Sequence, residues 1–429
     1  MAQAAPPAAA SGEVVVTAQR RNQAIEHVPV AVSAFTAKQR QVLGIATTQQ
    51  LSDFTPGLSY YASNDRTYIR GIGRNTVNLA TESGVATYYN GIYYGANASI
   101  AEQHDTLFVD QIEVDRGPQN TLHGSNADGG TLNYISARPT HSYYAEGRVG
   151  FENYGEYYGE AVVSGPITDW LRFRVGGNYS KQDGGFFNNL DGSREGGVLA
   201  QGNNGNQSYF EAQLDGNFGP HLDGWAQFSA GNYDTSFHTA STVGTIGRYE
   251  FANGLVSPSG FYGLCGLPGQ GGGLGCNAPG SQTIVPGSVT TAAVNASQFP
   301  GNNPSNTNIR DFIQQFHDSN RQTRDIAIAT RWTYHFDGAD LQYLGGYQQF
   351  YYDLQVSGTG ADAGVNSYQL QGPAGFGNLT IFPGGEHTSF VENEQYFSNE
   401  LSLASTKPGP IQWITGLYSY YEHYDQPVA

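Results

Sequence analysis

Residues 112–138, IEVDRGPQNTLHGSNADGGTLNYISAR, decide how this chain is organised. The stretch begins as a strand in which Ile112 and Val114 alternate with acidic residues. Residues 116–118 (RGP) interrupt that strand, because glycine has a free φ and proline lacks a backbone donor. A polar, glycine-rich turn follows before apolar alternation resumes at Leu132. Such a glycine density suits closely packed backbone. By itself the stretch fits either a phosphate loop or a tight β-turn, so the rest of the chain must decide.

The composition is unusual for a soluble enzyme of 429 residues. Only 13% of the residues are charged, while 57 are Gly and 29 are Tyr. The net charge of −17 argues against nucleic acid as a partner, since phosphate binding needs clustered Lys and Arg. No apolar run approaches the roughly 18–20 residues of a membrane helix. The composition favours a β-rich protein, and any membrane would have to be crossed by strands.

Residues 22–139 have the pattern of a compact α+β domain. Ser33 or Thr36 can cap a helix that extends to about Leu43. A second helix is expected over residues 48–54, because Pro and Gly follow at 56 and 57. Asn90-Gly91 lies between two aromatic strand segments and predicts a hairpin.

From residue 142 onward the pattern changes to long strands with period-2 alternation. The fourth strand is the clearest, with Phe210 and Leu214 on one face and Glu211 and Gln213 on the other. Nine such segments are expected: 142–152, 156–164, 170–180, 207–218, 223–233, 322–336, 339–352, 394–404 and 410–422.

The connections distinguish a membrane barrel from a soluble sandwich. The second, fourth, sixth and eighth connections are short. Only the first connection breaks the pattern, because it is short as well. The third, fifth and seventh are long, at about 26, 88 and 41 residues. Short turns on one side and long loops on the other are the layout of an outer-membrane barrel.

An α+β domain followed by such strands resembles the TonB-dependent outer-membrane receptor family. Residues 112–138 resemble that family's most specific plug signature, with Asn120 and His123 replacing a usual Gly and Tyr and Ser125 standing where Arg is common. The other matching segments are Leu51–Leu58, Ile69–Gly71, Tyr89–Tyr93 and the energy-coupling box at Glu13, Val14, Val15, Val16 and Thr17.

The resemblance implies an α+β plug domain followed by an antiparallel transmembrane β-barrel of 22 strands, of which about nine are present here. We therefore expect an incomplete barrel, with the C-terminal part missing. The implied division is a flexible N-terminus with the box (1–21), the plug (22–139) and the first part of the barrel (140–429).

The implied function is active uptake of a scarce ligand across the bacterial outer membrane. The ligand would be a ferric siderophore or a similar iron complex, an oligosaccharide or cobalamin, and the TonB C-terminal domain, with ExbB and ExbD, would supply energy through the box. A surface binding or docking protein and a passive porin are the alternatives. We expect a monomer without a cofactor, and no enzyme, because no nucleophile motif, metal-ligand pair or phosphate loop stands out.

The resemblance also implies candidate site residues. Arg70 and Arg116 correspond to plug–barrel lock residues, and we expect Glu400 to pair with one of them, with Glu113 nearby. The plug tips suggest a set of ligand contacts: Tyr61, Asn64, Arg66, Tyr94 and Asn97. Cys265 and Cys276, with ten residues between them in a Gly/Pro-rich segment, are expected to form a disulfide, with two free thiols as the alternative.

Overall fold

The computed structural model describes most of the plug and all nine long strands. The described residues are 14–17, 23–61, 66–74, 82–94, 107–124, 126–184, 187–189, 201–202, 205–237, 311–312, 318–357, 368–371, 378–381, 387–407 and 410–426. The predicted Cys265–Cys276 disulfide lies outside them.

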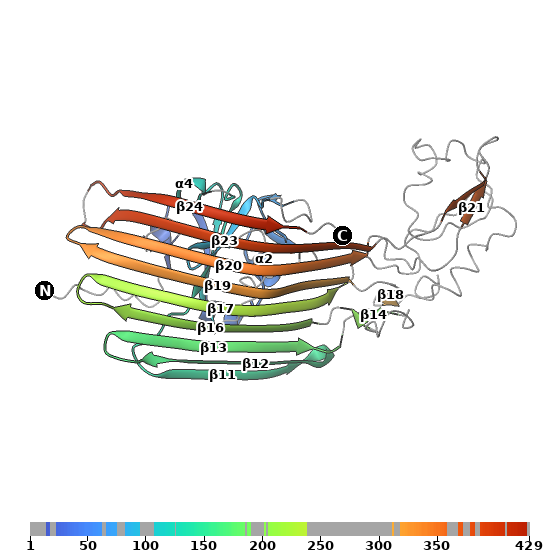
Figure 1. Ribbon diagram of the computed structural model, residues 1–429, viewed down its shortest axis with the longest axis horizontal. Helices are drawn as coiled ribbons and strands as arrows, with labels where there is room; N and C mark the ends of the chain where they lie inside the picture. Colours follow the sequence, from blue (N-terminus) through green and yellow to red (C-terminus); the bar gives the residue numbers. More distant parts are fainter. Residues whose placement is uncertain are drawn as a thin grey trace.

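Nine antiparallel strands form one curved sheet in simple sequence order (Figure 1). They are β11 (Tyr144–Glu152), β12 (Glu156–Pro166), β13 (Leu171–Gln182), β16 (Gly205–Asn217), β17 (Leu222–Phe237), β19 (Asp318–Phe336), β20 (Ala339–Ser357), β23 (His387–Ser405) and β24 (Ile414–Asp425). All nine predicted strands are present. Four of them, β17, β19, β20 and β23, extend furthest beyond the prediction, because cross-strand pairing holds residues whose own pattern shows little alternation.

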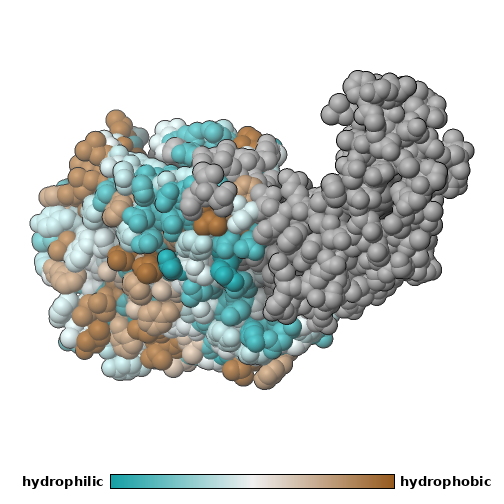
Figure 2. Space-filling model, turned by 45° about the vertical axis from the view of Figure 1, so that its right-hand side comes forward, coloured by the Kyte–Doolittle hydropathy of each residue, from teal (hydrophilic) through white to brown (hydrophobic). Residues whose placement is uncertain are grey.

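The sheet is polar on the face that covers the plug and apolar on the other. Phe210 and Leu214 on β16 are 43% and 48% exposed, whereas Glu211 and Gln213 between them are buried. The predicted alternation is thus confirmed. The apolar side chains point outward and the polar ones inward, which is the opposite of the arrangement in a soluble protein. Figure 2 shows apolar residues on the outer surface of the described region. A sheet with this outer face suits an apolar surrounding.

The plug contains a five-stranded sheet in the order β3-β9-β10-β7-β8. Its elements are β1 (Val15–Val16), β2 (Gln23–Ala24), η1 (Ile25–His27), β3 (Ala31–Thr36), α1 (Ala37–Leu43), α2 (Thr48–Phe54), β4 (Leu58–Tyr61), β5 (Arg66–Ile69), β6 (Ile72–Gly73), β7 (Val85–Tyr89), β8 (Ile92–Tyr94), β9 (Val109–Arg116), α4 (Asn120–His123) and β10 (Gly130–Ser136). Its core includes Leu51, Val114 and Leu132, each fully buried. The plug lies against the polar face of the large sheet, where β8 contacts β20 and β23.

Both predicted plug helices and the predicted hairpin are present. Thr36 caps α1 by accepting a hydrogen bond from the Gln39 amide, and Gly44 ends the helix at φ 70°. The alternative cap, Ser33, lies inside β3. Asn90 and Gly91 have φ values of 54° and 85°, as the tight turn between β7 and β8 requires.

The glycine-rich stretch is closely packed backbone. Gly130 has a φ of 146°, and a Cβ atom placed there would lie 2.1 Å from the carbonyl oxygen of Asp115. The short helix α4 lies between β9 and β10, Gly130 begins β10, and the two strands pair along their length. The stretch therefore serves the packing of the plug, and the phosphate-loop alternative has no support.

The remaining described elements are short: η3 (Asn153–Gly155), β14 (Phe187–Asn189), β15 (Gln201–Gly202), β18 (Asp311–Phe312), β21 (Tyr368–Gln371) and β22 (Asn378–Ile381). No helix of the described residues is long and apolar enough to cross a membrane.

Candidate functional site

The N-terminal segment 14–17 is docked onto the plug by its backbone. β1 pairs antiparallel with β2, matching Val15 with Ala24. The Ile25 amide also donates to the Val14 carbonyl at 3.0 Å. Val16 is 0% exposed and packs against Val28 in a small apolar cluster. The segment is therefore held as an added strand, an arrangement that depends mainly on main-chain bonds.

A buried carboxylate on β9 fixes the end of this segment. Glu113 is 0% exposed, and its two oxygens accept from the Thr17 amide at 2.9 and 3.1 Å. The Thr17 hydroxyl donates to the same carboxylate at 2.9 Å. Gln111 donates from Nε2 both to the Val15 carbonyl, at 2.9 Å, and to Glu113, at 2.8 Å. We call Gln111, Glu113 and Thr17 the latch.

Burial raises the pKa of Glu113 to about 7, although the Thr17 hydrogen bonds lower it. Burial likewise raises the pKa of Asp115, two residues along the strand, to about 6. At neutral pH the Glu113 carboxyl is therefore about half ionised, and the hydrogen bonds from Thr17 and Gln111 favour its ionised form.

A second polar group joins the plug to the sheet around Glu211. This buried residue on β16 accepts hydrogen bonds from four side chains: Tyr89 at 3.2 Å, Tyr209 at 2.9 Å, Gln213 at 2.8 Å and Gln227 at 2.6 Å. Asn90, at the plug hairpin, donates to Gln227 at 2.7 Å, and Arg331 donates to the Asn90 carbonyl at 2.8 Å. The hairpin is therefore anchored to the sheet by side chains from three strands.

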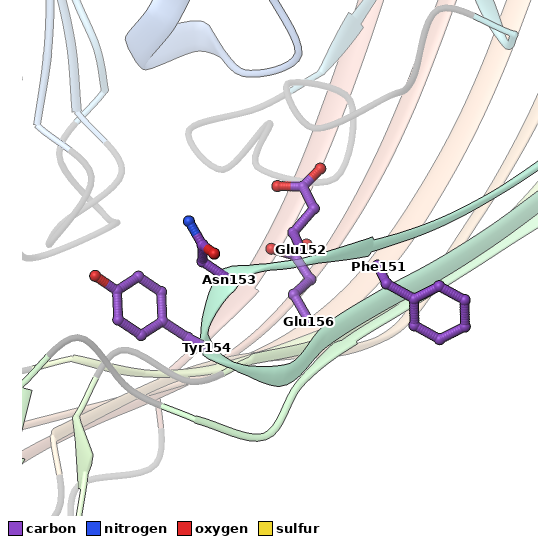
Figure 3. Close-up of a pocket in the computed structure, with 5 residues that line it drawn as sticks. All are labelled: Phe151, Glu152, Asn153, Tyr154 and Glu156. Carbon is purple, nitrogen blue, oxygen red and sulfur yellow. The ribbon is translucent and has the colours of Figure 1, made fainter.

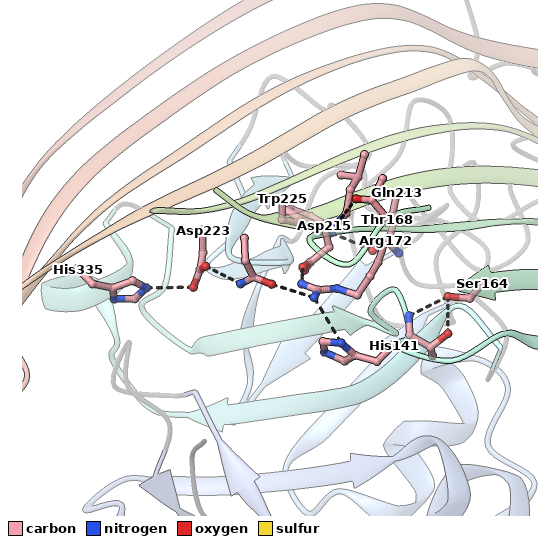
Figure 4. A network of polar contacts seen from close by, with 12 residues as sticks. His141, Ser164, Thr168, Arg172, Gln213, Asp215, Asp223, Trp225 and His335 are labelled. Atoms are coloured by element: carbon pink, nitrogen blue, oxygen red, sulfur yellow. Dashed lines mark hydrogen bonds and ion pairs between the residues drawn. The ribbon is translucent and has the colours of Figure 1, made fainter. Parts of the chain in front are cut away.

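The segment between plug and sheet is also anchored. The Arg138 guanidinium lies 3.9 Å from the centre of the Trp225 ring, and burial lowers the pKa of Arg138 to about 9. Figure 4 shows His141 beside Arg172, which forms an ion pair with Asp215. The same figure shows His335 on Asp223, with Nε2 to Oδ2 at 3.0 Å. These contacts lie at the strand ends that carry the short turns.

The predicted plug–barrel lock residues lie on three different elements. Arg70 is exposed, at the turn between β5 and β6 with a φ of 53°. Arg116 donates to the Pro56 carbonyl at 3.2 Å, a contact within the plug. Glu400 is half-buried on β23. The pairing of Glu400 with Arg70 or Arg116 stays a prediction, and Glu113, expected near that pair, binds Thr17.

Of the five predicted ligand contacts, the structure describes the side chain of Tyr94 alone. Tyr94 is 7% exposed and belongs to the plug core. The side chains of Tyr61 and Arg66, and the whole of Asn64 and Asn97, lie outside the described residues. Glu13 of the predicted box also lies outside them. These ligand contacts stay predictions.

A cavity of about 640 Å³ opens at the β11–β12 hairpin. It is lined by Phe151, Glu152, Asn153, Tyr154 and Glu156, with Phe151 directed away from the others in Figure 3. No deeply buried group faces it, so it is a surface hollow at the edge of the sheet. Within the described ranges no group of three or more His, Cys, Asp or Glu side chains could hold a metal ion.

Sequence reasoning did not find the latch or the Glu211 cluster. Gln111 and Glu113 are two residues apart on β9 and share one face of it, and that spacing is the signal that could have identified them. The partner, Thr17, is 96 residues away in the sequence, and no local pattern relates the two.

Comparisons with known proteins agree with this architecture. Residues 24–131 match the family model of the TonB-dependent receptor plug domain. The ferripyoverdine receptor of Pseudomonas aeruginosa is 25% identical over 158 residues, covering 36% of this chain and 19% of that receptor. The ferrichrome outer membrane transporter/phage receptor of Escherichia coli is 29% identical over 140 residues, covering 32% and 18%.

Solved structures share the fold over nearly the whole chain. The ferripyoverdine receptor of Pseudomonas aeruginosa has a TM-score of 0.59 at 15% identity, covering 96% of this chain and 45% of that one. The closed form of the ferric-catecholate import receptor Fiu of Escherichia coli has a TM-score of 0.60 at 15% identity, covering 94% and 48%. This chain thus spans about half the length of the solved receptors that it matches.

Proposed function

Because the chain carries the plug and part of the barrel wall of the TonB-dependent outer-membrane receptors, a family of transport receptors and not of enzymes, we propose that it takes part in energy-coupled uptake of a ferric siderophore. The ligand would bind from the side of the long connections. The TonB C-terminal domain would pull on Glu13–Thr17 and move the plug. The relatives support an iron complex over an oligosaccharide or cobalamin, since their names are those of ferripyoverdine and ferrichrome receptors.

The docked segment 14–17 is the observation that carries this proposal. A short strand on a plug edge can be exchanged for pairing with another protein's strand, because the bonds involved are mainly main-chain bonds. The latch gives this exchange a defined starting point, since Glu113 and Gln111 hold the segment by side-chain bonds that open without unfolding β9. Release of Thr17 is then the first step of coupling.

Iron uptake by cells whose receptor carries Val15→Pro tests the proposal. Proline removes a backbone donor and restricts φ, so pairing with the TonB strand is lost. Uptake of a radiolabelled ferric siderophore should fall to the level of a receptor deletion, while binding at the cell surface stays within about twofold. Val15→Ala, which keeps the backbone, is the matched control and should transport normally.

The two alternatives give different results in the same assay. A passive porin would keep its uptake when Val15 is replaced by proline. A docking protein without energy coupling would bind the complex and show no uptake even with the natural sequence. Either result would exclude the proposed coupling.

A further inference from the structure

Four buried glutamates on three strands of the sheet lie on the face that covers the plug: Glu160, Glu211, Glu392 and Glu394. Glu160 on β12 is 3.2 Å from Arg148 Nη1. Glu211 on β16 accepts from four donors. Glu394 on β23 is 0% exposed, and neither of its oxygens has a hydrogen-bond partner among the described residues. A buried carboxylate without donors is costly and calls for an explanation.

The surroundings of Glu394 add negative charge. Glu392, two residues earlier on the same face of β23, is also 0% exposed, and only its Oε1 receives the Tyr424 hydroxyl, at 2.8 Å. Glu422 on β24 is within electrostatic range. Arg74 of the plug is the cation in range, but it donates no hydrogen bond to Glu394. Among the described residues, Glu394 therefore has two carboxylates and one arginine within electrostatic range.

Aromatic side chains share the inner face of the sheet with these carboxylates, since Phe350 pairs with Glu394 across strands and the Tyr424 hydroxyl donates to Glu392. Phe350 and Tyr396 stack at 6.0 Å between ring centres, and Tyr396 and Tyr420 stack at 6.1 Å. Tyr93 of the plug meets Tyr420 edge to face at 5.5 Å. The buried hydroxyl of Tyr396 has no partner among the described residues. Rings and carboxylates together are the chemistry that binds organic cations.

The cluster also lies where a ligand would arrive. Glu394 pairs with Phe350 on β20 and with Tyr424 on β24, in the half of each strand next to the long connections. The plug contributes Tyr93, the middle residue of β8. The cluster therefore lies between β8 of the plug and the wall.

We propose that Glu392 and Glu394, with Tyr396 and Tyr420, form a subsite for an organic cation, an ammonium or guanidinium group carried by the transported iron complex. This rests on the proposed function. The cation supplies the donors that Glu394 lacks, and the rings cover its apolar stem. The low Lys and Arg content and the net charge of −17 also favour the approach of a cation.

Two iron complexes that differ in one charge test the subsite. The probes are a linear trihydroxamate ferric complex with a terminal ammonium group and the same complex with that amine acetylated. Binding to the purified full chain in detergent, measured by tryptophan quenching, should be at least about tenfold tighter for the ammonium form. In the Glu392→Gln/Glu394→Gln variant the two affinities should agree within about twofold.

Matched variants keep the test independent of folding. Glu160→Gln removes a wall carboxylate that already has Arg148 beside it and should keep the full preference. Tyr396→Phe removes a single hydroxyl and should reduce the preference by a few-fold. A far-UV circular dichroism spectrum checks that each variant is folded.

Equal binding of the two complexes by the natural chain, binding of neither, or a preference that survives the double substitution would overturn the subsite. Uptake of the acetylated complex that still depends on Val15 would then leave the proposed function intact. A preference for the ammonium form, together with uptake that Val15→Pro leaves unchanged, would support the subsite and contradict the proposed function.

Discussion

Glu113 in the plug and Glu394 in the wall are both completely buried, yet their partners differ. Glu113 accepts hydrogen bonds from Thr17 and Gln111, all supplied by the chain itself. Glu394 has no hydrogen-bond partner in the part of the chain that the structure describes. Burial alone therefore does not identify a functional carboxylate. Glu113, whose hydrogen-bond donors belong to the chain and can be released, forms a latch. Glu394, which lacks such donors among the described residues, is the group that we propose binds a ligand.

The largest expected effect comes from the backbone that supports the latch. Gly130→Ala places a Cβ against the Asp115 carbonyl at a φ that alanine rarely adopts. We expect a loss of about 3 kcal/mol or more in the free energy of unfolding of the plug, because strain and overlap add. Calorimetry of the full chain measures this loss. A substitution at Gly44, where a Cβ would meet nothing within 4 Å, is the control for positive φ alone.

The pH dependence of the plug tests the state of Glu113. Its folded pKa of about 7 is above the ordinary 4.5, so its contribution to stability is complete below about pH 4.5 and is lost as the pH rises through 7. Asp115 acts in the same direction over a lower range, up to about pH 6.

Between pH 5 and pH 8 the free energy of unfolding should therefore decrease, and Glu113→Gln should reduce that decrease by about 2 to 3 kcal/mol. Calorimetry at the two pH values gives the difference. An unchanged pH dependence in the variant would show that Glu113 does not titrate in this range.

A Glu→Gln substitution at Glu211 should destabilise the contact between the plug and the sheet. Glu211→Gln replaces an acceptor of four hydrogen bonds by an amide whose Nε2 faces donors. We expect a loss of about 2 kcal/mol in the contact between plug and sheet. Faster hydrogen exchange of the Tyr89 and Asn90 amides would report it, and unchanged exchange would contradict it.

At Glu394 the effect should be smaller and of opposite sign. Glu394→Gln replaces a buried carboxyl group that lies near Glu392 and Glu422 and has no hydrogen-bond partner among the described residues, so the ligand-free chain should become more stable by about 1 kcal/mol. The urea midpoint measures this gain. A destabilised variant would mean that a partner inside the chain already binds the carboxylate, and the contrast with Glu113 would disappear.

Local patterns predicted most of the fold. The capping residue Thr36, the Asn90-Gly91 turn and the alternation of Phe210 with Glu211 each depend on neighbours in sequence. The latch and the carboxylate subsite do not. Thr17 meets Glu113 across 96 residues, and the subsite depends on the packing of β23 and β24 against the plug, where Tyr93 contacts Tyr420. The lock that the sequence suggested, Glu400 with Arg70 or Arg116, is still to be tested.

Affinity for the TonB C-terminal domain tests the central claim most directly. If Glu113 holds segment 14–17 against the plug, Glu113→Ala releases it by removing hydrogen bonds to a charged group, which contribute about 1.5–3 kcal/mol. The purified full chain with Glu113→Ala should then bind the TonB domain at least about tenfold more tightly than the natural chain in a calorimetric titration. Equal affinity of the two chains, or no binding by either, would contradict the latch as the start of energy coupling.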